Sequence, residues 1–166
     1  MIHYIGTQTT LTQQSNGIQA SSIEACKTYC ESKAVLGVDT ETEGFDFTCK
    51  KMVMFQIGDE QEQFVIDTRH VSIEPLREVL ESPQITKIFH NAKFDIAFFE
   101  YHFGIEFPSF EDTMLLHYLI DENPGTHGLK QLSLKYTPYG DYEKPMYDWI
   151  DRYRKEHGIL KGEFQW

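Results

Sequence analysis

The sequence is short of cysteine, of positive charge and of long apolar runs, and each shortage excludes a class of protein. Only three of its 166 residues are cysteines. A small, odd number argues against a disulfide-stapled secreted domain, so we expect free thiols in a reducing cytosol. No apolar run approaches the roughly 20 residues that cross a bilayer, so no membrane partner is expected. The opening MIHYIGTQTTLTQQ has neither the basic nor the apolar segment of a signal peptide.

The shortage of positive charge bears on the partner. The chain has 15 basic and 26 acidic residues, a formal net charge of −11. An acidic protein does not usually hold a nucleic-acid backbone by charge alone. Binding to nucleic acid would therefore require metal ions that mask the acidic groups. Lys87, Lys93, Lys130 and Lys135 could form a modest basic rim, but ordinary solvated lysines explain them equally well.

Cysteine and histidine spacing gives no zinc site. Cys26 and Cys30 are four residues apart and share one face of an expected helix. We favour simple packing of that face over a redox pair or half of a metal site, because no second Cys/His pair with zinc spacing follows.

The length and the composition, with 40% hydrophobic and 14% aromatic residues, fit one globular domain. We expect a single domain over 1–166 with its core at about 33–137, and with 138–166 as a polar extension or the start of an insertion. Hydrophobic periodicity and turn residues predict the elements. Strands are expected at 2–6, 34–42, 51–59, 62–69 and 85–91. Helices are expected at 21–33, 74–82, 92–104, 112–122, 128–137 and 147–158, with a loop at 7–17 and an extended link at 107–112. This order predicts an α/β fold, a mixed sheet flanked by helices.

Two carboxylates follow an apolar strand segment. Asp39 and Glu41 stand at i and i+2 of the 34–42 strand, so both point to the same face. Side-by-side carboxylates repel each other, and a hard divalent cation such as Mg²⁺ or Mn²⁺ removes that repulsion. The alternative is a pair of ordinary solvated acids at a strand end.

A third carboxylate is expected from Asp95, in the first turn of the 92–104 helix, where it could reach the end of the 34–42 strand. The alternative is that Asp95 only favours the helix dipole. Either feature alone would not decide between the alternatives. The combination of a strand carrying Asp-x-Glu and, about fifty residues later, an Asn-x-x-x-Asp on a helix favours the metal site.

These motifs resemble a known family. VDTETEGFD (38–46) resembles the first motif of the DEDD superfamily of 3′–5′ exonucleases, and FHNAKFD (89–95) resembles the second. FGIEFPSFEDTMLLHYLIDENPGTHGLKQLSLKY (103–136) is similar to the proofreading domain of family A, polymerase I-like DNA polymerases of phage type. The resemblance covers roughly residues 35–137.

The resemblance implies a ribonuclease-H-like fold and a two-metal 3′–5′ exonuclease. Asp39, Glu41 and Asp95 would be the catalytic residues and would hold two Mg²⁺ or Mn²⁺ ions. Hydrolysis of the 3′-terminal phosphodiester of single-stranded DNA would then release 5′-monophosphates. Among the nucleic-acid-binding positions, Phe45 would wedge against the terminal bases, Asn91 would contact the strand, and Phe94 would lie near it. Core packing for the two phenylalanines, and a turn or cap role for Asn91, remain the alternatives.

The superfamily's third motif, with a fourth carboxylate, is not clearly present. Tyr147 and Asp151 have the Tyr-x-x-x-Asp spacing, but a surface helix explains them equally well. We expect the motif to lie beyond Trp166, with this chain as the N-terminal piece of a longer polymerase that supplies its polymerase domain in cis. The isolated piece could then be weak or inactive. Asp112 is expected to cap a helix.

Two other functions share these motifs: a ribonuclease D-like RNA 3′ exonuclease, and a non-catalytic nucleic-acid-binding module that keeps the exonuclease fold. For each of these, a cytoplasmic location in a bacterial cell or a phage-infected host is expected.

Overall fold

The computed structural model describes residues 1–7, 17–141 and 143–160. The chain divides into two compact units, Met1–Leu116 and His117–Trp166. The division lies inside the expected core of 33–137, and the single-domain interpretation stays a prediction. Most of the expected 7–17 loop falls outside the described residues. No helix in the described part of the chain is long and apolar enough to cross a membrane.

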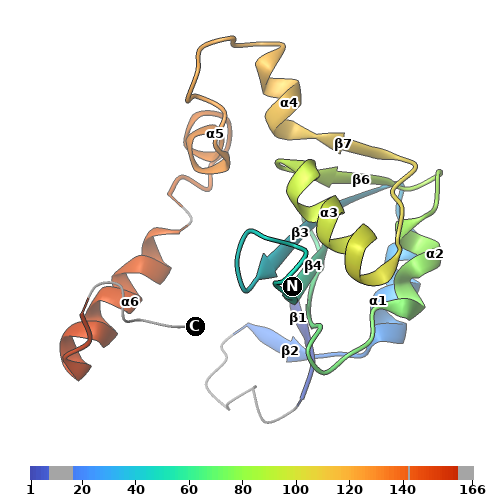
Figure 1. Ribbon diagram of the computed structural model, residues 1–166, viewed down its shortest axis with the longest axis horizontal. Coiled ribbons are helices and arrows are strands. Elements are labelled where there is room, and N and C mark those ends of the chain that lie inside the picture. Colours follow the sequence, from blue (N-terminus) through green and yellow to red (C-terminus); the bar gives the residue numbers. More distant parts are fainter. Residues whose placement is uncertain (8–16, 142, 161–166) are drawn as a thin grey trace. The chain divides into compact units, whose positions relative to one another are not determined.

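The first unit is built on a seven-stranded sheet in the order β2-β1-β5-β4-β3-β6-β7 (Figure 1). Its strands are β1 (Ile2–Ile5), β2 (Ile18–Ala20), β3 (Val35–Thr42), β4 (Met52–Gly58), β5 (Gln63–Asp67), β6 (Thr86–Phe89) and β7 (Phe110–Asp112). Its helices are α1 (Ile23–Glu31), the short 3₁₀ turn Glu74–Leu76, α2 (Arg77–Leu80) and α3 (Ala92–Phe103). The predicted α/β fold with a mixed sheet is therefore confirmed. The three-residue strand β2 was not predicted, and β7 occupies the end of the expected extended link.

Strand direction decides where functional groups gather. Only β4 runs against its neighbours; the β1–β2, β1–β5, β3–β6 and β6–β7 pairs are all parallel. The carboxyl ends of β1, β3, β5, β6 and β7 therefore lie at one edge of the sheet. In open α/β sheets, this is the edge at which ligands bind.

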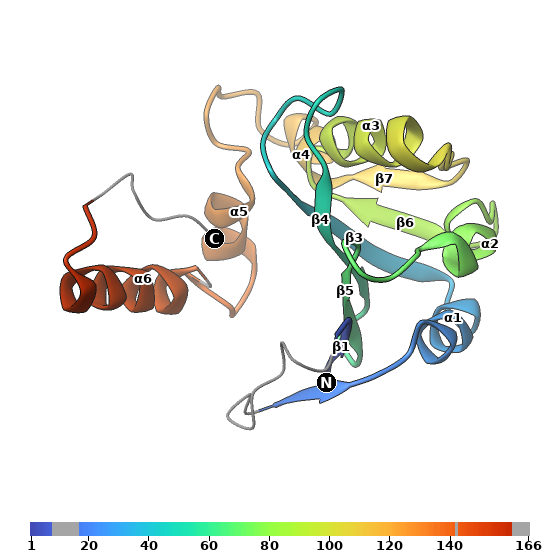
Figure 2. The same ribbon diagram turned by 60° about the horizontal axis from the view of Figure 1, so that its bottom comes forward.

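The helices α1, α2 and α3 all cover one face of the sheet (Figure 2). Buried apolar side chains such as Leu36 and Val38 of β3 and Phe55 of β4 point to that face, and Phe55 meets Phe99 of α3 at a ring-centroid distance of 5.1 Å. In β3, buried and exposed residues alternate. The strand is thus half-buried, and its second face is open within this unit.

Local sequence explains the ends of the helices. Ser22 caps α1 by accepting a hydrogen bond from the backbone N–H of Ala25 at 3.1 Å. Cys26 and Cys30 of α1 are fully buried free thiols with their sulfur atoms 4.0 Å apart, so the predicted packing of one helix face is confirmed. Gly104 ends α3 with φ at 59°, a left-handed conformation that glycine adopts without strain.

The second unit contains α5 (Leu129–Tyr136) and α6 (Lys144–His157), while α4 (Thr113–Tyr118) runs across the division between the units. Two buried histidines form its polar centre: the Nδ1 atoms of His117 and His127 are 2.7 Å apart, and Nε2 of His117 lies 3.2 Å from the hydroxyl of Tyr136. Helix α6 is amphipathic, and Ile150 is its buried residue.

Candidate active site

The first two site residues lie on the open face of the sheet. Asp39 and Glu41 alternate with the buried Val38 and Thr40 along β3, so the pleat turns both carboxylates away from the core. The pairing with β4 shifts register directly after Glu41, which is a β-bulge or similar irregularity. Bulges are frequent beside active sites, where they re-aim a side chain.

The third residue, Asp95, approaches β3 from the covered face. It is only 3% exposed, and its Oδ1 accepts a hydrogen bond from the hydroxyl of Thr40 at 2.6 Å. Thr40 points to the covered face of the sheet, whereas Asp39 points to the open face. Asp95 therefore contacts β3 from the covered face, near the end of the strand that carries the first two carboxylates. This hydrogen bond shows that Asp95 of α3 reaches the end of β3, as the sequence predicted.

Negative charge at this edge is poorly compensated. Burial and repulsion by Asp39 raise the pKa of Asp95 to about 6, although the Thr40 hydrogen bond works in the opposite direction. Loss of surrounding water and repulsion by Asp39 raise the pKa of Glu41, and desolvation raises that of Asp39. No Lys or Arg ion pair reaches any of the three among the described residues.

The chemistry of these donors fits a hard divalent cation, which binds carboxylate oxygen and neutralises such repulsion. As the side chains stand, no three His, Cys, Asp or Glu residues in the described ranges form a group that could hold a metal ion. The Thr40 hydroxyl holds the Asp95 carboxylate, and the charge of Asp39 acts on that carboxylate. The metal role of Asp39, Glu41 and Asp95 stays a prediction.

Asp112, at the end of β7, organises the junction that positions Asp95. Its Oδ2 accepts from the backbone N–H of Ala92 at 2.8 Å, and its Oδ1 accepts from those of Asn91 and Met114 at 3.0 and 2.9 Å. It therefore holds the start of α3 as well as the start of α4. The predicted cap at the start of α4 is confirmed. The hydrogen bonds from Asp112 to the start of α3 were not predicted from the sequence.

His90 also lies near the predicted site residues. It follows β6 at the carboxyl edge of the sheet, and electrostatic attraction by its ring lowers the pKa of Asp39, against the larger effect of desolvation. Its Nδ1 lies 2.9 Å from the hydroxyl of Thr113. That hydroxyl donates to the carbonyl of Phe89 at 3.0 Å, so Nδ1–H of His90 must be the donor to Thr113. The sequence feature that could have identified His90 is its position directly after β6, the strand that pairs with β3.

The three predicted nucleic-acid contacts have different environments. Phe45 is 92% exposed, and its ring lies edge-on to that of Phe94, with ring centroids 6.2 Å apart, so core packing does not explain it. Phe94 is half-buried against the core. Asn91 takes a left-handed conformation with φ at 67°, and its side chain caps no helix, so it is a turn residue with an exposed side chain. Contact with nucleic acid stays a prediction for all three.

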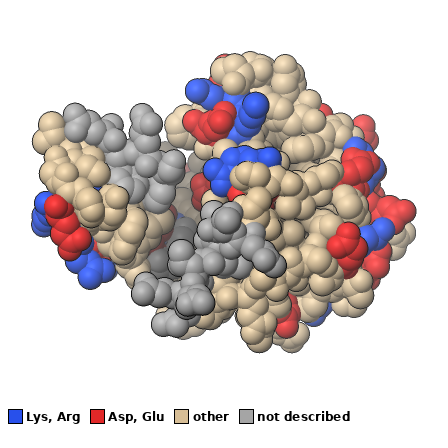
Figure 3. Space-filling view, turned by 90° about the horizontal axis from the view of Figure 1, so that it is seen from below, with Lys and Arg blue, Asp and Glu red and all other residues tan. Residues whose placement is uncertain are grey.

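The lysines considered for a basic rim have different environments. Lys87 is fully buried and donates to the carbonyls of Ser82 and Ile85 at 2.7 and 2.6 Å. Lys130 and Lys135 form ion pairs with acidic residues of the second unit. On the face seen in Figure 3, basic side chains stand among acidic ones and do not form a continuous stripe.

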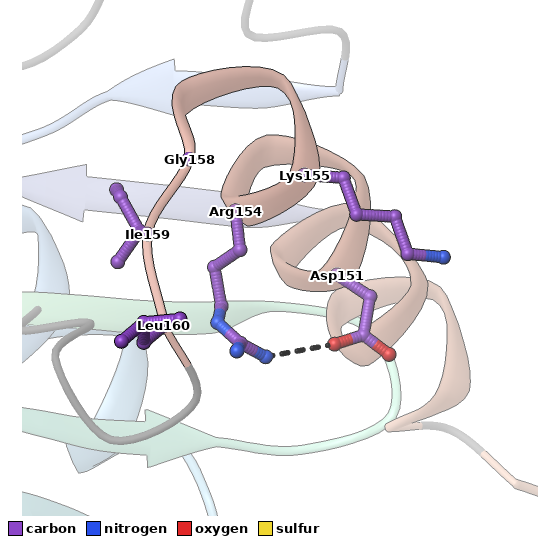
Figure 4. Close-up of a pocket in the computed structure, with 6 residues that line it drawn as sticks. All are labelled: Asp151, Arg154, Lys155, Gly158, Ile159 and Leu160. Atoms are coloured by element: carbon purple, nitrogen blue, oxygen red, sulfur yellow. Dashed lines mark hydrogen bonds and ion pairs between the residues drawn. The ribbon is translucent and has the colours of Figure 1, made fainter.

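The residues considered for the third motif lie in the second unit. Tyr147 is half-exposed on α6, and the Asp151 carboxylate lies 3.2 Å from the Arg154 guanidinium. Asp151 and Arg154 line a small pocket at the end of α6, with Lys155, Gly158, Ile159 and Leu160 (Figure 4). None of the predicted site carboxylates of the first unit lines it. Whether Asp151 is the fourth carboxylate stays a prediction.

Comparison with known proteins identifies the family of this chain. Residues 8–159 match the 3′–5′ exonuclease family. The chain is 44% identical over 100 residues to the DNA polymerase of Escherichia phage T5, a match that covers 57% of this chain and 12% of that protein. It is 40% identical over 92 residues to DNA polymerase I of Aquifex aeolicus, covering 54% of this chain and 14% of the relative. The chain thus spans only about an eighth of the length of these relatives.

Solved structures match the fold. Escherichia coli RNase D, described as an exoribonuclease involved in structured RNA processing, superposes with a TM-score of 0.64 at 20% identity, covering 80% of this chain and 32% of that one. Brucella melitensis NrnC with bound Mg²⁺ gives a TM-score of 0.63 at 19% identity, covering 96% and 83%. The predicted ribonuclease-H-like architecture is therefore confirmed, and with the family match over most of its length this chain belongs to the 3′–5′ exonuclease family.

Proposed function

We propose that this domain is the proofreading exonuclease of a DNA polymerase and that it removes nucleotides from the 3′ end of single-stranded DNA. The observation that supports the proposal is the edge of the sheet where Asp39, Glu41 and Asp95 all have a raised pKa and none has a Lys or Arg ion pair among the described residues. The similarity to phage and bacterial DNA polymerases supports DNA as the substrate. The fold shared with RNase D makes RNA the second candidate.

The proposed cofactor is a pair of divalent cations, Mg²⁺ or Mn²⁺. Asp39, Glu41 and Asp95 would hold them, and when bound the ions supply activation of water and stabilisation of the leaving 3′ oxygen. Other residues of the chain hold the proposed metal-binding carboxylates in position. The Thr40 hydroxyl holds Asp95 by a 2.6 Å hydrogen bond, and Asp112 anchors the start of the helix that carries it. Phe45 offers an exposed ring on which a terminal base can stack.

The proposal is tested by incubating 5′-labelled single-stranded DNA with the protein in Mg²⁺, in Mn²⁺ and in EDTA. We expect a ladder that shortens from the 3′ end only with metal. Replacement of Asp39 by Ala should lower the rate by about 10³-fold, on the order of the loss caused by removing a group that stabilises developing charge. Glu60→Ala, at an exposed acidic residue in the β4–β5 turn, is the matched control and should keep the wild-type rate.

Two further arms separate the alternatives. The same assay on labelled RNA distinguishes a DNA exonuclease from an RNA exonuclease by the ratio of the two kcat/KM values. Loss of activity in Asp151→Ala, with folding retained, would place the fourth carboxylate on α6. If the folded protein shows no metal-dependent degradation of DNA or RNA, the assay is repeated on a chain extended past Trp166, which would include the expected third motif. Inactivity of that longer chain would overturn the catalytic proposal and favour a binding module.

Phe45→Ala is expected to weaken binding of single-stranded DNA about tenfold, because stacking on an aromatic ring contributes roughly 1–3 kcal/mol per base. Stability should hardly change, since the ring is 92% exposed. Fluorescence anisotropy with a labelled oligonucleotide measures the affinity, and urea unfolding measures the stability. Phe110→Ala, at an exposed aromatic on the edge strand β7, is the control. Equal affinities for Phe45→Ala and wild type would refute the stacking role.

A further inference from the structure

A buried carboxylate with an exposed arginine stands at the end of β5. Asp67 is fully buried. Arg69 donates two hydrogen bonds to its carboxylate, from Nε to Oδ1 and from Nη2 to Oδ2, both at 2.8 Å. The hydroxyl of Tyr4 donates to Oδ2 at 3.1 Å, and Nδ1 of His70 lies 3.2 Å from the same oxygen. The Arg69 contact is the main reason that the pKa of Asp67 is held far below its usual range. The carboxylate is thus charged and its partner is held in one orientation.

The strand register places this group on the same face as the site carboxylates. Glu41 of β3 pairs with Met54 of β4, and Met54 pairs with Asp67 of β5. Directly paired residues share a face of the sheet, so Glu41 and Asp67 lie on the open face. With two strand spacings between them, their Cα atoms are roughly 10 Å apart. Both strands end at the same edge, and Arg69 follows just beyond it.

The arginine still faces solvent. Its side chain is 49% exposed, although the carboxylate that it holds is completely buried. Guanidinium has five N–H donors in a rigid fork, and Asp67 engages Nε and Nη2 from one side. The pair therefore has its negative end inside the protein and its positive, donor-rich end at the surface. Such a pre-oriented guanidinium is well suited to a phosphate, which it can bind through two parallel hydrogen bonds.

Two other cations of this unit, Lys27 and Arg77, form ion pairs with neighbouring acids on the covered side. Lys27 of α1 lies 2.6 Å from a carboxylate oxygen of Glu78, and Arg77 of α2 binds Glu74 at 2.6 Å. On the right of Figure 3, charges of both signs lie side by side. With a net charge of −11, this protein needs a local donor wherever a polyanion is to lie along it.

We propose that Arg69 binds a backbone phosphate of the nucleic-acid strand, upstream of the 3′-terminal phosphodiester, and acts as a positioning residue on the open face. The inference rests on the proposed function, because the carboxylate pair defines where the 3′ end lies. Asp67, Tyr4 and His70 serve to orient the guanidinium. The strand then runs across the sheet from β3 toward β5.

The test compares Arg69→Gln with the double variant Asp67→Asn/Arg69→Gln. The double variant removes both charges at once, so it keeps the net charge and leaves no unpaired buried carboxylate. Both are expected to weaken binding of a labelled single-stranded oligonucleotide about tenfold, measured by anisotropy in EDTA. The slope of log K against log salt should fall by about 0.7, the value for one lost contact to a single strand. In Mg²⁺, KM should rise while kcat at saturating DNA stays within about twofold.

Two controls complete the design. Arg69→Lys keeps the charge but not the fork, so it should recover part of the affinity. Lys27→Gln removes a positive charge on the covered side and should leave the salt slope unchanged. A folded double variant with wild-type affinity, salt slope and KM would overturn the inference and leave Arg69 as a partner of Asp67 alone. If wild type binds DNA but does not degrade it, catalysis fails while the binding comparison still decides the role of Arg69; if wild type neither binds nor degrades DNA, both proposals fall.

Discussion

Replacing Asp95 by Asn is expected to make the metal-free protein more stable at pH 7.5 by about 3 kcal/mol, while nuclease activity is lost. Asp95 is 3% exposed, and its pKa is raised from 3.8 to about 6, chiefly by burial. Above pH 6 the folded protein must hold this charge in a poorly hydrated place. This rise in pKa means that the charged carboxylate is less favourable in the folded protein than in the unfolded chain by about 3 kcal/mol. Asn is nearly isosteric, and its Oδ1 can still accept the hydrogen bond of Thr40.

The pH dependence has a definite sign. An acid whose pKa is higher in the folded state binds protons more tightly there, so its protonation stabilises the fold at low pH. This contribution in the wild type declines as the pH rises from about 4 and is gone above about 6. The advantage of Asp95→Asn over wild type should therefore be small near pH 4 and reach its full size by pH 7.5.

Urea unfolding in EDTA at both pH values measures this difference. Asp46→Asn is the control with the opposite sign, because hydrogen bonds from Thr48 lower the pKa of Asp46, so losing its charge should not stabilise the protein. Under the proposed function, Mg²⁺ should stabilise the wild type more than Asp95→Asn. If Asp95→Asn is less stable than wild type at pH 7.5, the assignment of uncompensated charge to this carboxyl is contradicted.

Asp112→Ala is expected to lower the free energy of unfolding by about 3–5 kcal/mol. The carboxylate accepts hydrogen bonds from four backbone N–H groups, those of Asn91, Ala92, Met114 and, at 3.3 Å, Leu115. It is 6% exposed, so water replaces these bonds only in part. Each donor left without a partner costs about 1–3 kcal/mol if it remains buried. The starts of two helices lose their anchor together.

The measurement is urea unfolding of the purified variant, with Glu111→Ala, the exposed neighbour on β7, as the control. The control should stay within about 0.5 kcal/mol of wild type. Asp112→Asn should fall between them, because its amide NH₂ cannot accept from a backbone N–H. A loss below about 1 kcal/mol in Asp112→Ala would mean that these four hydrogen bonds are dispensable. Since α3 carries Asp95, activity should decline in Asp112→Ala even at temperatures where it remains folded.

Much of the fold could be read from local patterns. Strand alternation placed Asp39 and Glu41 on one face, and the helix after 85–91 was expected at Ala92 with its end at Gly104. These follow from the pleat and from helix-capping residues, which act over a few positions. Local patterns failed where pairing partners decide the structure: β2 is only three residues long, and it exists because β1 offers it a parallel edge.

The sequence by itself determined the class of fold, the family, the carboxylate pair on β3 and the helix that carries Asp95, because each is encoded within a short segment. Only the tertiary structure decided that Asp95 is held by Thr40 on the covered face, that Lys87 is buried, and that Asp112 anchors α3 across twenty residues. It also placed Asp67 and Arg69 level with Glu41 through the register of β4. These facts depend on which strands become neighbours and in what register, and that is set by packing of the whole sheet.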